Sequence, residues 1–281
     1  MTTETVNGVD LYVQVQGSGE RLVLVHGGWG DADNWGAVVG PLAERFEVVT
    51  FDRRGHSRSG DGSGPGSRLE DAADVAALIE HLGGGPAHVV GNSYGGSITL
   101  TLVASRPDLV ASAVAHEPPL FAVLDGTDDP DVAAEVRGIR QRIDAVVRLL
   151  DSGHHEGGAR RFVESVAFGP GSWERLPAAL RRVFVSNAAT FVDEQNDPAF
   201  FSIDAPALAA AAVPLLLTRG TESPSLFTAV IHRLATLVPA AEVGVLPGVG
   251  HVPQTTHPEL FVANLLAFHN RLGTARAGWA P

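Results

Sequence analysis

The residues best suited to chemistry lie in the run 88–97, which reads His-Val-Val-Gly-Asn-Ser-Tyr-Gly-Gly-Ser. Ser93 is the central residue of a Gly-x-Ser-x-Gly motif, with a short apolar run before it and a helical run after it. A strand, a sharp turn and a helix form the context in which such a serine hydroxyl stands clear of a sheet as a nucleophile. The helix N-terminus behind it favours developing negative charge. The motif alone fits a glycine-rich turn with an incidental serine equally well.

A general base for Ser93 is predicted in the loop Gly250-His251-Val252, which follows the last expected strand. In a parallel sheet, reactive groups collect in the loops at the carboxyl ends of strands, so His251 can reach a serine in a neighbouring loop. It would take the serine proton and later protonate the leaving group. The chain has 11 histidines, and His251 is singled out by its position.

The loop His26-Gly27-Gly28-Trp29 follows another expected strand. Its glycines let backbone amides turn inward, and the amide of Gly28 paired with that of Tyr94 would form an oxyanion hole. His26 is expected to be a structural hydrogen-bonding residue. Trp29 is expected to be part of a pocket wall.

Three further motifs predict no cofactor site. His154-His155-Glu156 resembles a metal-binding group, but no third ligand stands at a suitable spacing. The run 62–66 lacks the lysine and the serine or threonine of a phosphate loop, and no Gly-x-Gly-x-x-Gly is present. The run Asp52-Arg53-Arg54-Gly55-His56-Ser57 is expected to fix a tight turn and to shape the pocket floor. We therefore expect neither a metal nor a cofactor.

The elements that must position these residues alternate between strands and helices. Strands are expected over 3–6, 11–16, 21–25, 46–51, 87–90, 109–115, 213–218 and 241–246. Helices are expected over 33–43, 69–82, 97–105, 225–237 and 258–272. This alternation predicts an α/β fold with a mostly parallel sheet flanked by helices, and the first two strands form an antiparallel hairpin at one edge.

The alternation stops between residues 120 and 212, where only helices are expected, over 131–150, 158–168, 173–189 and 205–212. The sequence therefore predicts a core of residues 1–118 and 213–281 and a helical insertion, or cap, of residues 119–212. The tail 273–281 is expected to be loose.

The composition excludes several classes of partner. The 281 residues are 44% hydrophobic and carry a formal net charge of −12, which argues against nucleic acid and anionic membranes. There is no cysteine, hence no disulfide and no thiolate metal site. The first residues do not resemble a signal peptide, and no apolar run approaches the ~20 residues of a membrane span. We expect a cytoplasmic protein, and assembly into a homo-oligomer is left open.

Taken together, the motifs resemble those of the α/β-hydrolase family over nearly the whole chain. The matching segments are His26-Gly27-Gly28, Asp52-Arg53-Arg54-Gly55-His56-Ser57, Gly91-Asn92-Ser93-Tyr94-Gly95-Gly96, Val213-Pro214-Leu215-Leu216-Leu217 and Gly248-Val249-Gly250-His251. The resemblance implies Ser93 as nucleophile, His251 as base, and Gly28 and Tyr94 as oxyanion donors. It also implies that the insertion is the family's cap.

The acid of the triad departs from the commonest pattern. Many members carry it in the loop after the strand that follows the cap, but Ser223 occupies that position here and Glu222 stands one residue earlier. Some members, such as certain haloalkane dehalogenases and zearalenone-type lactonases, place the acid after the strand next to the nucleophile strand, where this chain has Glu117. Ser93 and Glu117 end consecutive strands joined by a helix, which places them close together. We predict Glu117, with Glu222 as the alternative; Glu117 could instead pair with a cap arginine.

These residues predict a serine hydrolase that cleaves a carboxylic ester or lactone through an acyl-enzyme. Aromatic residues would make the pocket apolar and suited to a medium-sized hydrophobic substrate; those assigned to the pocket are Trp29, Phe121, Trp173, Phe184 and Phe191. The alternatives are a C–C bond hydrolase of ring-cleavage diketones and a ligand receptor that has lost catalysis. Dehalogenation is disfavoured, because the dehalogenases use an aspartate where Ser93 stands.

Overall fold

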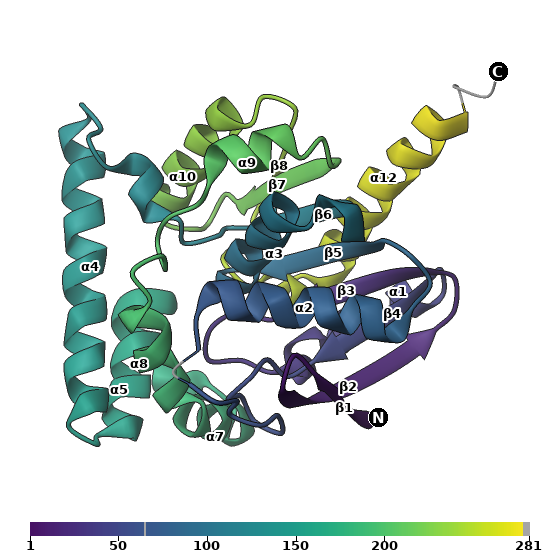
Figure 1. The fold of residues 1–281 in the computed structure, drawn as a ribbon. Coiled ribbons are helices and arrows are strands. Elements are labelled where there is room, and N and C mark those ends of the chain that lie inside the picture. Colours follow the sequence, from purple (N-terminus) through teal and green to yellow (C-terminus); the bar gives the residue numbers. More distant parts are fainter. Residues whose placement is uncertain (65, 278–281) are drawn as a thin grey trace.

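The computed structural model describes residues 1–64 and 66–277, and within them eight strands form one sheet (Figure 1). The strands are β1 (Thr2–Val6), β2 (Val9–Gly17), β3 (Glu20–Val25), β4 (Phe46–Phe51), β5 (Ala87–Asn92), β6 (Val110–His116), β7 (Leu215–Gly220) and β8 (Glu242–Leu246). Their order is β1-β2-β4-β3-β5-β6-β7-β8. β2 pairs antiparallel with β1 and β4, and every other pairing is parallel. The predicted α/β class with a mostly parallel sheet is confirmed.

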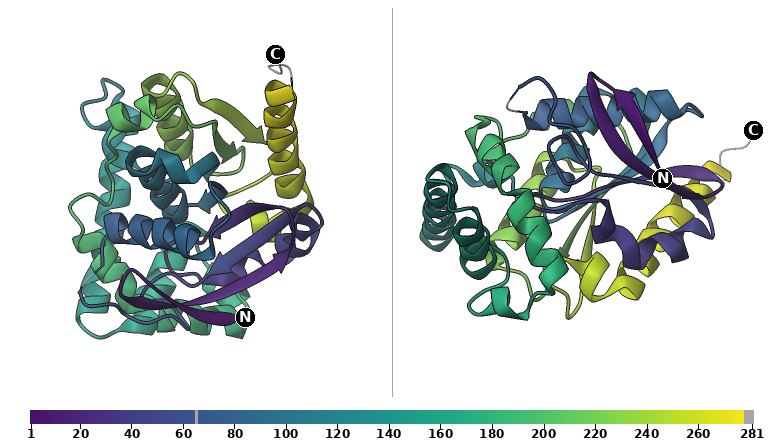
Figure 2. Two further views of the ribbon diagram at one scale, coloured as in Figure 1. Left: turned by 45° about the vertical axis from the view of Figure 1, so that its right-hand side comes forward. Right: turned by 90° about the horizontal axis from the view of Figure 1, so that it is seen from below.

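Helices cover both faces of the sheet (Figures 1 and 2). On one face pack α1 (Gly36–Ala43), α11 (Pro253–Thr256) and α12 (Pro258–Ala277); on the other pack α2 (Arg68–Leu82), α3 (Tyr94–Ser105), α9 (Ala205–Ala210) and α10 (Ser225–Leu237). Successive strand residues point to opposite faces, so Val89 belongs to the larger hydrophobic cluster and Val90 to the smaller one. The central strands are therefore apolar on both sides, as a doubly covered parallel sheet requires.

Between β6 and β7 the described chain is helical, with α4 (Pro130–Asp151), α5 (His155–Phe162), α6 (Ser172–Arg175), α7 (Ala178–Ser186) and α8 (Ala188–Asn196). We call α4 to α8 the cap. Figure 1 shows them side by side along one flank of the core. The predicted insertion 119–212 also contained α9, but this helix packs against α3 and α10 of the core. Its Leu208 is buried in the larger hydrophobic cluster.

Several predicted boundaries are wrong. The single helix expected over 173–189 falls in three helices. Pro177 has no N–H to continue α6, and ψ of 139° at Leu176 and 142° at Pro177 makes an extended link before α7, while Asn187 separates α7 from α8. The helix expected over 158–168 begins at His155 and continues as a π-helical turn, η4 (Val163–Ala167). Shorter turns are η1 (Ala32–Trp35), η2 (Pro107–Leu109) and η3 (Phe121–Leu124). The tail expected to be loose is helical to Ala277, and 278–281 lie outside the described residues.

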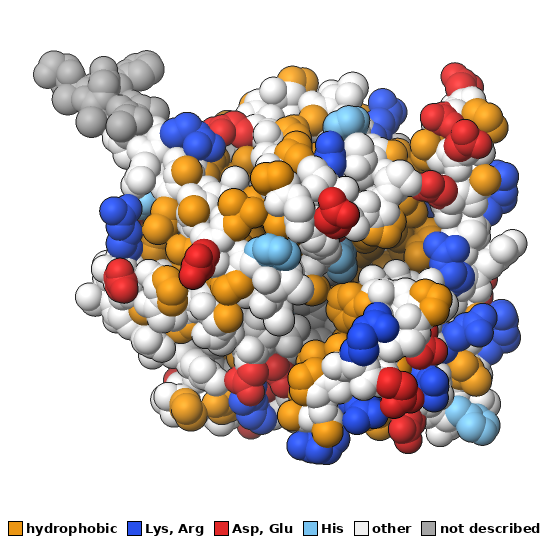
Figure 3. All heavy atoms as spheres, turned by 180° about the vertical axis from the view of Figure 1, so that it is seen from behind, with side chains coloured by type: hydrophobic (Ala, Val, Ile, Leu, Met, Phe, Trp, Pro, Cys, Tyr) orange, Lys and Arg blue, Asp and Glu red, His pale blue; other side chains and the backbone are white. Residues whose placement is uncertain are grey.

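The surface carries charges of both signs, and Figure 3 shows them interspersed on the face opposite to that of Figure 1. On this face the molecule is hollowed between core and cap, where hydrophobic side chains gather. Among the described residues, no helix has both the length and the apolar character needed to cross a membrane.

Candidate active site

Ser93 lies at the turn between β5 and α3, with φ 56° and ψ −125°. A non-glycine residue adopts such a left-handed conformation only where the surroundings hold it. The Ser93 N–H donates to the His116 carbonyl oxygen at 2.8 Å, which ties the turn to β6. A side chain on Gly91 would collide with the Gly95 carbonyl, and one on Gly95 with that of Val25. Both glycines of the motif are therefore required by close backbone approach.

His251 and Glu117 meet beside this turn, although 134 residues separate them. The His251 Nδ1 and the Glu117 Oε2 are 2.7 Å apart. Glu117 follows the last residue of β6, and its own φ of 47° turns the side chain toward the loop after β8. Since β7 lies between β6 and β8 in the sheet, the loop after β8 reaches across the end of β7 to bring these two side chains together.

The Glu117 carboxyl is completely buried and doubly held. Its Oε1 accepts a hydrogen bond from the Gly220 N–H at 2.7 Å, while its own N–H donates to the Thr218 carbonyl at 3.0 Å. Burial raises the pKa of Glu117, but the hydrogen bond and charge of His251 outweigh burial and bring the pKa to about 2. At neutral pH this group is a carboxylate with a fixed direction.

The alternative acid lies elsewhere. Glu222 is exposed, and its Oε1 accepts a hydrogen bond of 3.4 Å from the neighbouring Thr221 hydroxyl. Ser223, at the position where an acid is usual, contributes to lowering the pKa of Glu117. The loop that commonly supplies the acid here supports the carboxylate of another strand.

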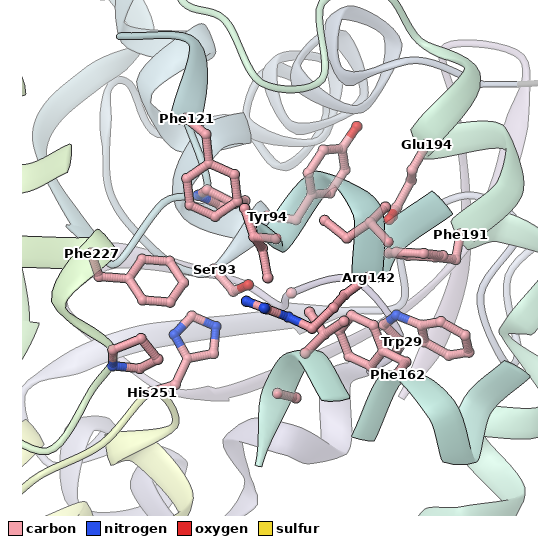
Figure 4. Close-up of a pocket in the computed structure, with 18 of the residues that line it drawn as sticks. Trp29, Ser93, Tyr94, Phe121, Arg142, Phe162, Phe191, Glu194, Phe227 and His251 are labelled. Atoms are coloured by element: carbon pink, nitrogen blue, oxygen red, sulfur yellow. The ribbon is translucent and has the colours of Figure 1, made fainter. Parts of the chain in front are cut away.

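Hydrogen bonds hold the backbone of His251, and an aromatic contact holds its ring. The Asn92 amide donates to the His251 carbonyl at 2.8 Å, and the Gln254 amide donates to Asn92 Oδ1 at 3.1 Å. The Phe227 ring stacks on the imidazole with the centroids 4.6 Å apart. Figure 4 shows Ser93 and the His251 ring beside one another at the cavity.

Ser93 and His251 open onto a cavity of about 310 Å³ between core and cap. Its wall includes both residues predicted as oxyanion donors and four of the five predicted aromatic residues, namely Gly28, Tyr94, Trp29, Phe121, Phe184 and Phe191. The fifth prediction is wrong, since Trp173 is buried inside the cap, where the Arg181 guanidinium lies 6.0 Å from its ring centroid. The prediction overlooked four other lining residues, Arg142, Phe162, Glu194 and Phe227.

Trp29 is the centre of the aromatic wall. Its ring packs on Phe162, Phe184 and Phe191 at centroid distances of 4.7, 5.8 and 4.8 Å. Trp29 belongs to the core loop after β3 and the three phenylalanines to the cap, so the wall joins the two parts of the molecule. Such aromatic pairs add stability beyond the area that they bury.

The loop that carries Gly28 is held by His26. The His26 Nε2 accepts from the Arg53 N–H at 3.0 Å, and its Nδ1 lies 2.8 Å from the Gly27 carbonyl. Burial and the charge of Arg53 together lower the pKa of His26 to about 3. The ring is therefore neutral and links two loops, which is the structural role predicted for it.

The turn 52–58 is fixed by Asp52, whose carboxylate accepts from the backbone N–H of Ala32 at 2.8 Å and of Arg58 at 3.0 Å. The tight turn was predicted from sequence. The sequence did not reveal that Arg53, buried beneath the cavity, pairs with carboxyls of α2 and of the cap.

Asn187 fastens the cap to the core loops. It is completely buried, its amide donates to the Gly30 carbonyl at 2.9 Å, and its Oδ1 accepts from the Ser57 N–H at 2.8 Å. Asn187→Ala should lower the free energy of unfolding by ~1–3 kcal/mol, because both backbone groups lose a buried partner. Denaturant unfolding would measure this, with the same change at the exposed Asn196 of α8, Asn196→Ala, as control. An unchanged midpoint would contradict this role.

Trp173 should contribute to stability and not to substrate choice. Trp173→Ala is expected to cost ~3–5 kcal/mol of unfolding free energy and to leave the ranking of substrates unchanged. Phe191→Ala, which removes a cavity wall, should change that ranking. The measurement is kcat/KM across esters of increasing acyl length. A reordered ranking in Trp173→Ala would show that its influence reaches the cavity.

One group outside the cavity has the composition of a metal site. Ligand atoms of Glu20, His88 and His269 lie within 4.8 Å of one another. Glu20 Oε2 and His269 Nε2 are 2.9 Å apart, and His88 Nδ1 lies 2.7 Å from the Ser112 hydroxyl. Hydrogen bonds account for these contacts. In the pair His154-His155, the His154 Nδ1 lies 3.0 Å from the Ser152 hydroxyl.

Comparison with known proteins agrees with this geometry. The model of the family described as "Alpha/beta hydrolase family" matches residues 22–264. The uncharacterized hydrolase YraK of Bacillus subtilis is 42% identical over 128 residues, which are 45% of this chain and 47% of that protein. The chain spans less than half the length of several curated relatives that it matches, including this one.

Two further similarities cover almost the whole chain. The 2-(acetamidomethylene)succinate hydrolase of Mesorhizobium japonicum is 27% identical over 94% of this chain and 92% of its own length. The crystal structure of an alpha/beta hydrolase from Sphaerobacter thermophilus superposes with a TM-score of 0.74 at 26% identity, covering 95% of this chain and 100% of the other.

Proposed function

The chain belongs to the alpha/beta hydrolase family, and on that premise we propose that it is a serine hydrolase that cleaves a carboxylic ester or lactone through an acyl-enzyme on Ser93. The observation that carries the proposal is the 2.7 Å contact between His251 Nδ1 and the buried Glu117 carboxylate, beside Ser93 at the same cavity. A nucleophile, a base and an orienting acid are the three groups that acyl transfer to a serine needs.

In the proposed mechanism the Ser93 Oγ attacks the carbonyl carbon while the His251 Nε2 accepts the hydroxyl proton. Glu117 accepts the hydrogen bond from Nδ1–H and stabilises the imidazolium that forms. The backbone amides of Gly28 and Tyr94 bind the oxyanion, a contribution of typically ~10²–10³ in rate for each donor. The imidazolium then protonates the leaving group, and water, deprotonated by His251, releases the acid and restores Ser93.

The cavity supports a medium-sized hydrophobic substrate. About 310 Å³ and an aromatic wall suit a compact apolar acyl or alcohol part. The relative that is named a hydrolase of 2-(acetamidomethylene)succinate supports hydrolysis as the class of reaction. A homo-oligomeric state and a cytoplasmic location stay predictions.

A substrate panel tests the proposal against its two alternatives. We expect turnover of p-nitrophenyl butanoate or of a small lactone. Cleavage of a ring-cleavage diketone without turnover of either would favour the C–C bond hydrolase. Binding of these compounds without turnover of any would favour the receptor. Either result would contradict the proposed ester or lactone hydrolysis.

A further inference from the structure

Two acidic residues of the cap line the cavity, Glu135 and Glu194, and of these Glu194 is the buried one. Glu194 of α8 is 6% exposed and belongs to the cavity wall. Figure 4 shows its carboxyl reaching toward the cavity from the side of Phe191. Its Oε2 is buried and has no hydrogen-bond partner among the described residues. Burying a carboxyl oxygen without a hydrogen-bond partner costs free energy. The groups around Glu194 must account for its burial.

Glu194 borders the loop that we assign to oxyanion binding. Its Oε2 lies 3.1 Å from the position that a Cβ on Gly28 would occupy. Glycine at position 28 therefore leaves room for this carboxyl. The free oxygen stands beside the backbone at which the carbonyl of a substrate would be bound.

The other oxygen of Glu194 belongs to a buried ion cluster. Glu194 Oε1 accepts from Arg53 Nη2 at 2.5 Å, and Arg53 Nη1 donates to Asp71 Oδ2 at 2.9 Å. One guanidinium thus faces two carboxyls, and the three side chains are only 2–6% exposed. With both acids ionised, the cluster would hold a net negative charge in a medium of low polarity, which is strongly unfavourable. One of the two carboxyls therefore holds its proton to a higher pH than an exposed carboxyl does.

Glu194 is the acid that holds the proton more firmly. Burial, with the charges of Asp71 and Asp193, raises its pKa to about 7 against the opposing charge and hydrogen bond of Arg53. Burial raises the pKa of Asp71 to about 6. Because Arg53 donates to Oε1, a proton on Glu194 resides on Oε2, which is the oxygen beside Gly28.

Two further neighbours of Glu194, His56 and Tyr94, are uncharged. His56 Nε2 lies 3.8 Å from Glu194 Oε1, but burial and the charge of Arg53 hold the pKa of His56 well below its usual value. Burial raises the pKa of Tyr94 above its usual value, so its phenol is neutral too. The charge of the cluster is therefore set by Arg53, Glu194, Asp71 and Asp193, while Asp74 and Arg54 act on the pKa of Asp71 in opposite directions.

We propose that Glu194 is a specificity-determining residue whose neutral carboxyl donates a hydrogen bond from Oε2 to an oxygen atom in the acyl part of the substrate. The inference rests on the proposed function and narrows its substrate class. Preferred substrates are esters or lactones that carry an ether, hydroxyl or carbonyl oxygen two or three bonds from the carbonyl carbon that is attacked. A substrate without that oxygen leaves the buried carboxyl unpaired and is bound less well in the transition state.

The same contact predicts a dependence on pH. When the pH rises past the pKa of about 7, Glu194 loses its proton and the hydrogen bond to the substrate oxygen. The new negative charge also lies beside Gly28, where it opposes a developing oxyanion. The preference for oxygen-bearing substrates is therefore expected below that pKa and lost above it.

The test uses the full chain and two pairs of matched p-nitrophenyl esters. Methoxyacetate is compared with butanoate, and 3-methoxypropanoate with pentanoate; each pair differs by an ether oxygen in place of a methylene group. The quantity measured is the ratio of kcat/KM within a pair. Dividing the wild-type ratio by that of a variant cancels the intrinsic reactivity of the esters.

Three variants separate direct recognition from structural damage. Glu194→Ala should lower the ratio in at least one pair by ~10- to 100-fold. Glu194→Gln should keep the ratio and remove its decline above neutral pH, because Arg53 holds the amide oxygen and turns the –NH₂ donor toward the cavity. Asp71→Asn removes the second carboxyl that faces Arg53, so it should lower the pKa of Glu194 and move the decline of the ratio to lower pH.

The proposal is overturned if Glu194→Ala leaves both ratios unchanged, if Asp71→Asn leaves the pH at which the ratio declines unchanged, or if Glu194→Gln abolishes the preference. Infrared difference spectra of wild type against Glu194→Gln add a readout that needs no turnover. A carboxylic acid C=O band that disappears near the pKa of about 7 is expected. If the band is present and no ester is hydrolysed, the proposed function has failed; if esters are hydrolysed and the band is absent, the Glu194 proposal has failed.

Discussion

Ser93→Ala is expected to leave the fold intact and to reduce kcat by up to ~10⁶-fold, the loss seen when a triad serine is removed. The hydroxyl is the atom that would form the acyl-enzyme, and His251 has no other nucleophile to activate in the proposed mechanism. Alanine is no larger than serine and can adopt the backbone conformation of residue 93, so the turn between β5 and α3 should persist. The measurements are steady-state turnover and the thermal unfolding midpoint.

Ser97→Ala provides the matched control for this change. Ser97 lies one turn along α3, is completely buried, and its hydroxyl has no hydrogen-bond partner among the described residues. Its replacement should leave kcat close to that of the wild type. A Ser93→Ala protein that keeps even a tenth of the activity would show that another group carries out the attack.

Glu117→Gln should reduce kcat by ~10³–10⁴-fold. The Gly220 N–H, which donates to Oε1 at 2.7 Å, should hold the amide oxygen of the glutamine. The –NH₂ group then replaces Oε2 and donates to His251 Nδ1. That contact selects the tautomer in which Nε2 carries the proton, so His251 could not accept the proton of Ser93.

Glu222→Gln is the control for Glu117→Gln, because it makes the same chemical change in the loop where the family commonly places its acid. Glu222 is exposed, so its replacement should leave kcat nearly unchanged. The assignment of Glu117 as the triad acid would be wrong if Glu222→Gln were the crippled variant and Glu117→Gln stayed near the wild type.

The sequence was sufficient for the core fold because each part of the evidence is local. The apolar strand, the glycines around Ser93 and the helix after it lie within twenty residues of one another, and strand–helix alternation restricts the order of the sheet. Glu117 could be favoured over Glu222 because parallel strands that follow one another end at the same edge. The structure shows the 2.7 Å contact that this reasoning expected.

The cap could not be predicted to the same degree. A buried aromatic residue of an amphipathic helix has the same sequence pattern whether it faces a cavity or the interior of the cap, which is why Trp173 was misplaced while Phe184 and Phe191 were not. The pairing of Arg53 with Glu194 spans 141 residues and depends on how α8 packs on the core. The only local signal was Glu194 standing three residues after Phe191, on the same face of a helix.

Labelling with a fluorophosphonate, followed by mass spectrometry of the digested protein, tests the central claim most directly. The probe forms a stable adduct with a serine that an adjacent base activates, and it does not require the natural substrate. We predict a single phosphonate adduct on the peptide that contains Ser93, and its absence from Ser93→Ala. An unlabelled Ser93 in a wild-type protein that hydrolyses esters, or an adduct on a different serine, would contradict the account.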